Sequence, residues 1–124
     1  MSSEAWVITG GIYHVGLIIF HLLFWKLFRW QEELANITFI NRMVMQVMNI
    51  SLIFIFFIFA YLSFFHTAEL LATTVGRTLL TLISLFWLLR TLQQILFFRL
   101  KSKISVLLTL VFCGGFIIYL IPVW

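Results

Sequence analysis

The chain has 124 residues, of which 64% are hydrophobic, 19% are aromatic and only 10% are charged, and its formal net charge is +4. Eight basic and four acidic side chains cannot coat a globule of this size, and one small core cannot bury so much apolar surface. These proportions exclude a water-soluble fold, so the excess apolar surface must face lipid. The single Cys113 excludes a disulfide framework and a cysteine-based zinc or iron–sulfur site within one copy.

Four runs of residues are long and apolar enough to cross a bilayer, which requires about 20 mostly apolar residues in a helix. We place these spans at residues 5–28, 42–65, 74–98 and 104–121. The alternating ten-residue segments that are typical of membrane β-strands do not occur. The sequence therefore predicts an all-α polytopic membrane protein, with one transmembrane domain over residues 1–124 that forms an antiparallel four-helix bundle.

Basic residues are concentrated in two of the three loops. The first and third loops carry Lys26, Arg29, Arg42, Arg99, Lys101 and Lys103. The two termini and the second loop together carry only Arg77. Because cytoplasmic loops carry an excess of Lys and Arg, we expect both termini on the non-cytoplasmic side, most simply of a bacterial cytoplasmic (inner) membrane. This topology explains the basic charge, so the charge does not indicate nucleic-acid binding.

The first loop shows helical spacing of apolar residues. Trp30, Leu34 and Ile37 fall on one face, with Glu32 and Glu33 on the other. Such an arrangement suits a short helix that lies in the membrane interface, and a plain linker is the alternative.

A group of polar residues lies in the cytoplasmic half of the first three spans. It consists of His21, Gln46, Asn49, Arg90 and Gln94. Polar groups are costly in hydrocarbon, so their positions carry most of the functional information. One hypothesis is that Arg90, His21 and Asn49 line a small cavity for an anion, an anionic headgroup or a proton path.

A simpler interpretation of the same residues, which we favour, is structural. Arg90 lies about 12 Å from the cytoplasmic end of its span, close to the limit at which an arginine side chain reaches the interface. Its stem would then extend over Trp87, while the amides join neighbouring helices.

Three histidines raise the possibility of a bound metal or haem. His14 in the first span and His66 at the outer end of the second could serve as ligands, with Glu69 as a nearby carboxylate. A lone histidine in a membrane helix more often hydrogen-bonds a neighbouring helix. We therefore expect no cofactor, and keep haem or metal as an alternative.

The fourth span repeats small residues at Ser105, Thr109 and Cys113, followed by Gly114 and Gly115. A spacing of four places the first three on one face, which predicts a seam where another helix packs closely.

The sequence gives no positive indication of an enzyme, because paired intramembrane carboxylates, a nucleophile motif and a phosphate-binding loop are absent. Three hypotheses remain. The one we prefer is a small membrane protein that acts through helix–helix interaction, as a homo-oligomer or as an accessory subunit of a membrane partner. The alternatives are an oligomeric channel or carrier for an anion or lipid that uses Arg90, His21 and Asn49, and a redox protein that uses His14 and His66.

Overall fold

The computed structural model describes all residues 1–124, and every regular element in it is a helix. Four helical segments are long and apolar enough to cross a membrane. They are Ser3–Leu22, Phe39–Phe65, Thr74–Phe98 and Lys103–Val123. The predicted all-α class is confirmed, and the four apolar helices indicate a small integral membrane protein.

The helices follow one another through short connections. In chain order they are α1 (Ser3–Leu22), α2 (Phe24–Leu27), α3 (Trp30–Glu33), the 3₁₀ turn η1 (Leu34–Asn36), α4 (Phe39–Phe65), α5 (Thr67–Ala72), α6 (Thr74–Gln93), the π-turn η2 (Gln94–Phe98), α7 (Lys103–Leu120) and the 3₁₀ turn η3 (Ile121–Val123). Each of the four long helices begins after a serine or threonine whose side-chain oxygen accepts a backbone N–H of the first turn. These caps satisfy N–H groups that have no partner inside the helix.

The first span is shorter than predicted. α1 ends at Leu22, and the separate short helix α2 follows at Phe24–Leu27. Arg29 then adopts a left-handed backbone conformation with φ 53°. This turn folds the chain back so that the rings of Trp30 and Phe24 lie edge to face, 5.5 Å apart. The apolar run that the sequence presents as continuous up to residue 28 is thus divided between α1 and α2.

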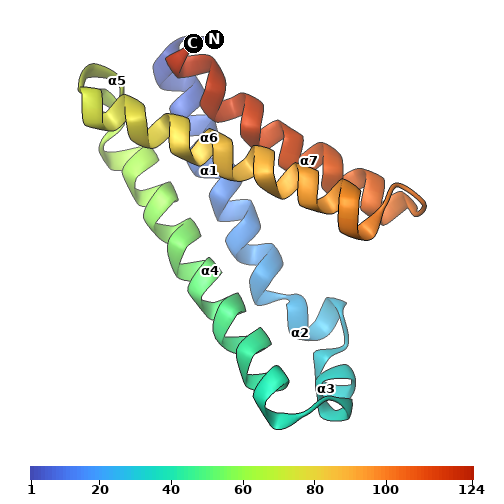
Figure 1. Cartoon of the computed structure of the whole chain (residues 1–124). Helices are drawn as coiled ribbons and strands as arrows, with labels where there is room; N and C mark the ends of the chain where they lie inside the picture. The colour runs from blue at the N-terminus through green and yellow to red at the C-terminus, as the bar shows by residue number, and fades with distance from the viewer.

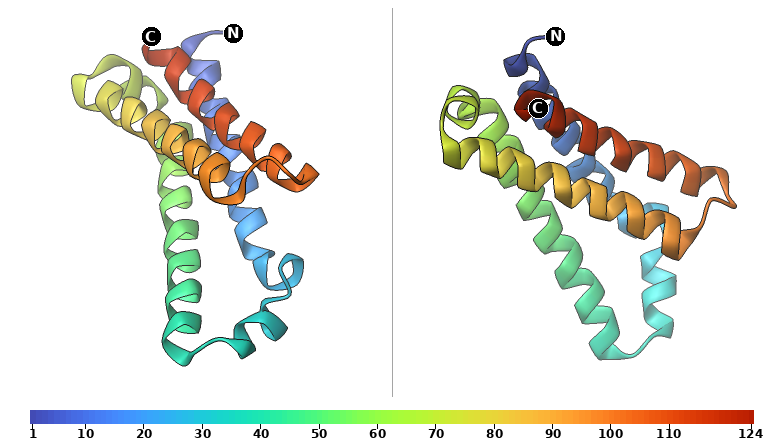
Figure 2. Two further views of the ribbon diagram at one scale, coloured as in Figure 1. Left: turned by 45° about the vertical axis from the view of Figure 1, so that its right-hand side comes forward. Right: turned by 45° about the horizontal axis from the view of Figure 1, so that its top comes forward.

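The four long helices form two antiparallel hairpins, α1 with α4 and α6 with α7 (Figure 1). The hairpins meet near the two chain termini and diverge toward the first and third loops, as the two further views also show (Figure 2). The antiparallel pairs are as predicted. The arrangement differs from the expected single bundle, because α4 packs along α1 but not along α6. The side of the membrane on which the termini lie stays a prediction.

The core lies where the hairpins cross. Its fully buried apolar members are Val7, Leu17, Phe56, Leu70, Leu80, Ile83, Trp87, Phe112 and Tyr119. Only 24 of the 124 residues are buried, and large apolar side chains such as Phe54 and Leu107 are more than half exposed. A lipid environment removes the cost of that exposure, so the burial pattern agrees with a membrane location.

The buried face of α7 differs from the predicted seam of small residues. Ser105, Phe112, Gly115 and Tyr119 are buried, whereas Thr109 and Cys113 are only half-buried. The close approach occurs at Gly115, where an added Cβ would lie 2.6 Å from the Tyr13 hydroxyl. The predicted seam is thus confirmed at Ser105 and Gly115 but not at Thr109 and Cys113, because the rings of Phe112 and Tyr119 occupy the rest of the interface.

Substitution of Gly115 by alanine should destabilise the fold. The new methyl group would also meet Cγ of the buried Trp87 at 2.9 Å, and overpacking of this kind costs about 1–3 kcal/mol. Thermal unfolding in detergent, followed by circular dichroism, would measure the effect.

Gly114→Ala is the matched control, because nothing lies within 4 Å of a Cβ at that position. Alanine favours a helix over glycine by about 1 kcal/mol, so this variant should unfold at an unchanged or higher temperature. Equal losses of stability in both variants would contradict the packing described for Gly115.

Candidate functional site

A buried histidine joins the two hairpins. His14 of α1 has no exposed surface, and both of its ring nitrogens have partners. The indole Nε1 of Trp87 donates a hydrogen bond to His14 Nε2 at 3.2 Å. Because an indole N–H can only donate, Nε2 is the acceptor and the proton of the neutral ring is on Nδ1. That Nδ1 lies 3.0 Å from the carbonyl oxygen of Gly10 and 2.9 Å from the hydroxyl of Tyr119.

The hydroxyl of Tyr119 in α7 extends this network to α4. It lies 2.8 Å from Oγ of Ser63 in α4. Trp87, His14, Tyr119 and Ser63 thus form one hydrogen-bonded chain with a member from each long helix, which we call the His14 node. One further side-chain bond joins the hairpins nearby, from the Tyr13 hydroxyl to the carbonyl oxygen of Val111 at 2.9 Å. All side-chain hydrogen bonds between the hairpins lie in or beside the His14 node.

The second predicted ligand, His66, lies outside this network. Its Nδ1 is 3.1 Å from Oε1 of Glu69, and its ring contacts the ring of Tyr61. The structure brings His66 and Glu69 together, while the contacts of His14 are with the node and with the rings of Phe56 and Phe59. No group of three His, Cys, Asp or Glu side chains is close enough to hold a metal ion. Ligation by His14 would require the loss of a hydrogen bond that the node already makes.

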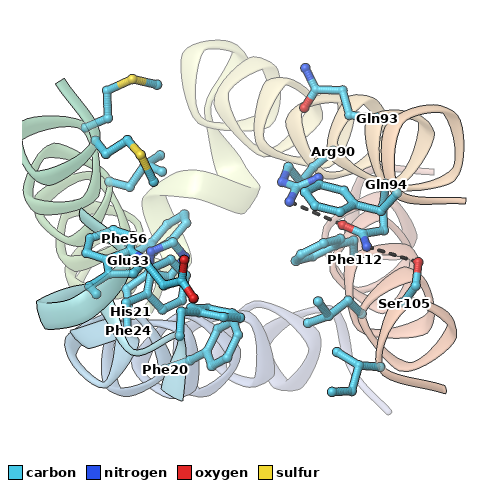
Figure 3. Close-up of a pocket in the computed structure, with 18 of the residues that line it drawn as sticks. Phe20, His21, Phe24, Glu33, Phe56, Arg90, Gln93, Gln94, Ser105 and Phe112 are labelled. Carbon is cyan, nitrogen blue, oxygen red and sulfur yellow. Dashed lines mark hydrogen bonds between the residues drawn. The ribbon is translucent and has the colours of Figure 1, made fainter. Parts of the chain in front are cut away.

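A cavity of about 840 Å³ opens between the diverging ends of the hairpins (Figure 3). Its lining is mostly aromatic and aliphatic. The aromatic members are Phe20, Phe24, Phe28, Trp30, Phe56, Phe86, Trp87, Phe98 and Phe112. Leu34 and Ile37 of the first loop line it as well. The predicted short helix in this loop is confirmed as α3 and η1, and Trp30 and Leu34 are buried on its inner side.

His21 and Asn49 form a reciprocal pair that joins α1 to α4. The ring Nδ1 of His21 lies 2.8 Å from Oδ1 of Asn49. The amide Nδ2 of Asn49 donates to the backbone carbonyl of His21 at 3.2 Å. His21 lines the cavity, and Asn49 stands behind it as a buried partner that fixes its ring.

Arg90 lies on the opposite wall of the cavity. Its guanidinium lies over the ring of Phe112, with Cζ 4.4 Å from the ring centroid, and donates to Oε1 of Gln94 at 3.4 Å. The buried Gln94 in turn donates from Nε2 to the hydroxyl of Ser105 at 3.2 Å. The cation–π contact with Phe112 and the hydrogen bond to the neutral amide of Gln94 hold the Arg90 guanidinium at the cavity wall.

Arg90 has no acidic partner. The ion pairs of the structure are Arg29 with Glu32 and His66 with Glu69. One carboxylate, that of Glu33, does line the cavity, on the wall that carries His21 (Figure 3). It is exposed and makes no ion pair with Arg90.

The polar residues predicted to form one group therefore lie in separate places. His21 with Asn49 and Arg90 with Gln94 form two pairs that face each other across the cavity. Gln46 does not line it, and its side chain donates to the carbonyl oxygen of Arg42 at 3.4 Å. Sequence reasoning missed Glu33, whose helical spacing indicated an interfacial helix but not that the loop folds over a cavity.

Comparisons with protein-family models, with curated proteins and with solved structures give no match to this chain.

Removal of the Tyr119 hydroxyl should destabilise the crossing of the hairpins. Tyr119→Phe keeps the ring but leaves His14 and Ser63 without one partner each. Two lost hydrogen bonds of this kind are worth about 1–2 kcal/mol in the free energy of unfolding. Reversible unfolding in mixed micelles measures this quantity.

Tyr61→Phe provides the control, because Tyr61 is 48% exposed and its hydroxyl makes no hydrogen bond. Its free energy of unfolding should change by less than about 0.5 kcal/mol. If the two variants were equally stable, the His14 node would not hold the hairpins together.

Proposed function

We propose that this protein binds a lipid or lipid-like amphiphile that carries an anionic group, a phosphate or a carboxylate, in the cavity between its two hairpins. The observation that carries the proposal is the guanidinium of Arg90, which stands at the cavity wall without an acidic partner. A charged side chain at membrane depth is costly unless it is paired or hydrated. An anionic headgroup in the cavity supplies the missing charge, and a guanidinium binds phosphate or carboxylate through two parallel hydrogen bonds.

The remainder of the cavity fits the apolar part of such a ligand. The rings of Phe56, Trp87 and Phe112 line it together with aliphatic side chains such as Leu52 and Leu108. A volume of about 840 Å³ falls within the range of about 300–1,000 Å³ that is usual for ligand pockets. An acyl chain would contact these apolar walls and exclude water from them. A small hydrated anion would leave them exposed to water.

The location of the cavity also favours a lipid ligand. It lies between the loop ends of the two hairpins, and the first and third loops at those ends carry the basic residues. Basic side chains beside a membrane attract anionic headgroups by about 1 kcal/mol each. With the predicted topology, the ligand would enter from the cytoplasmic leaflet, and we propose the bacterial cytoplasmic membrane as the location.

The other hypotheses have less support. The exposed apolar faces suit lipid as well as protein, so action as an accessory subunit or a homo-oligomer stays a prediction. A haem or metal site at His14 and His66 would compete with the hydrogen bonds of the His14 node.

Binding of phosphatidylglycerol should depend on Arg90. Arg90→Gln removes the charge and keeps some of the side-chain length. A charge-assisted hydrogen bond is worth about 1.5–3 kcal/mol, so the affinity should fall about 10-fold to 100-fold. Native mass spectrometry of the delipidated protein in mild detergent, titrated with phosphatidylglycerol, measures the affinity.

The matched control is Arg77→Gln in the same helix. The Arg77 side chain donates to the carbonyl oxygen of Val123 near the termini and does not line the cavity. This variant should bind phosphatidylglycerol as the unmodified protein does. Unchanged affinity in Arg90→Gln, or an equal loss in both variants, would contradict the proposed function.

A further inference from the structure

We infer that the cavity recognises a headgroup with two opposite charges, in which Arg90 holds a phosphate and Glu33 holds a primary ammonium group. This inference rests on the proposed function and names the class of its ligand as phosphoethanolamine lipids. It starts from the charges that line the cavity, which are one guanidinium and one carboxylate, on facing walls.

Glu33 differs from the other acidic residues of the chain. Glu32 is paired with Arg29 and Glu69 with His66, while Glu4 lies in the first turn of α1 near the terminus. Glu33 alone lines the cavity, and no cation of the protein pairs with it. The short helix α3 that carries it is anchored by Trp30, which is only 8% exposed, while the Glu33 side chain itself is exposed. A carboxylate held at the cavity without a partner is suited to an ammonium group.

Aromatic rings on the same wall add to this preference. Phe24, Phe28 and Trp30 line the cavity beside Glu33. One face of the Phe24 ring is covered by His21, 4.2 Å away between centroids, and its ring meets those of Phe28 at 4.8 Å and Trp30 at 5.5 Å edge to face. Cations bind to the faces of such rings, most strongly to tryptophan. Charge and ring contacts therefore favour a cationic group on this wall, and Arg90 favours an anionic group on the other.

A headgroup with one negative and one positive charge can pair with Arg90 and Glu33 at the same time. A phosphate that binds Arg90 and Gln94 neutralises one wall, and the ammonium group that follows it along the headgroup neutralises Glu33. A purely anionic headgroup leaves the carboxylate of Glu33 unpaired next to negative charge, which is unfavourable. The cavity should therefore prefer phosphatidylethanolamine to phosphatidylglycerol with the same acyl chains.

The test compares the two lipids on one protein. Native mass spectrometry of the delipidated full chain would give the affinity ratio of phosphatidylethanolamine to phosphatidylglycerol, with identical acyl chains. The ratio should exceed one for the unmodified protein and fall about tenfold in Glu33→Gln. Glu32→Gln, which changes the neighbouring carboxylate outside the cavity, should leave the ratio unchanged. Equal unfolding temperatures would show that the two variants fold alike.

The alternative outcomes separate the inference from the proposed function. If Arg90→Gln weakens both lipids but Glu33→Gln leaves the ratio unchanged, an anionic lipid site remains and the inference is wrong. If Glu33→Gln raises the affinity for both lipids equally, Glu33 competes with the ligand for Arg90, and the inference is again wrong. If neither variant changes any affinity, both proposals fail.

A soluble competitor identifies the source of the headgroup. O-phosphoethanolamine carries the same two charges without acyl chains, so millimolar amounts should displace little bound phosphatidylethanolamine from the apolar cavity. Displacement at concentrations equal to that of the lipid would support the charge assignment but contradict a lipid as its source.

Discussion

The buried imidazole of His14 is the interaction on which the arrangement of the two hairpins depends. It accepts a hydrogen bond from Trp87, and its Nδ1–H points to the Gly10 carbonyl and the Tyr119 hydroxyl. No buried side-chain nitrogen or oxygen of the structure lacks a hydrogen-bond partner. Because an unsatisfied polar group in an apolar interior is costly, each member of the node requires the others to stay in place. The node therefore fixes where the hairpins cross and lets their other ends diverge.

The cavity is a consequence of this crossing. At the crossing, the rings of Phe56 and Phe112 both stack on Trp87, 5.5 Å and 5.7 Å away, and close the inner end of the space. Toward the loops, each hairpin satisfies its own polar groups, His21 with Asn49 in one and Arg90 with Gln94 in the other. No hydrogen bond crosses the gap there, so the space is open to a ligand that supplies charge and apolar surface together.

The sequence predicts the properties that depend on local composition. Length and hydropathy give the four spans. The spacing of four places Arg90 and Gln94 on one helix face, where their side chains are hydrogen-bonded. The crossing of the hairpins does not follow, because it depends on a bond between His14 and Tyr119, which are 105 positions apart in the chain. Glu33 was missed for a related reason, since only the tertiary fold places its loop over the cavity.

The distances between spin labels on the two hairpins test the crossing most directly. In a Cys113→Ser background, one pair of labels at Ala35 and Lys101 reports on the loop ends, and another at Ser2 and Trp124 reports on the ends near the termini. Pulsed electron–electron double resonance in lipid nanodiscs should give a clearly longer distance for the loop pair than for the terminal pair. Equal, short distances for both pairs would show a closed parallel-sided bundle with no cavity, and would contradict this account.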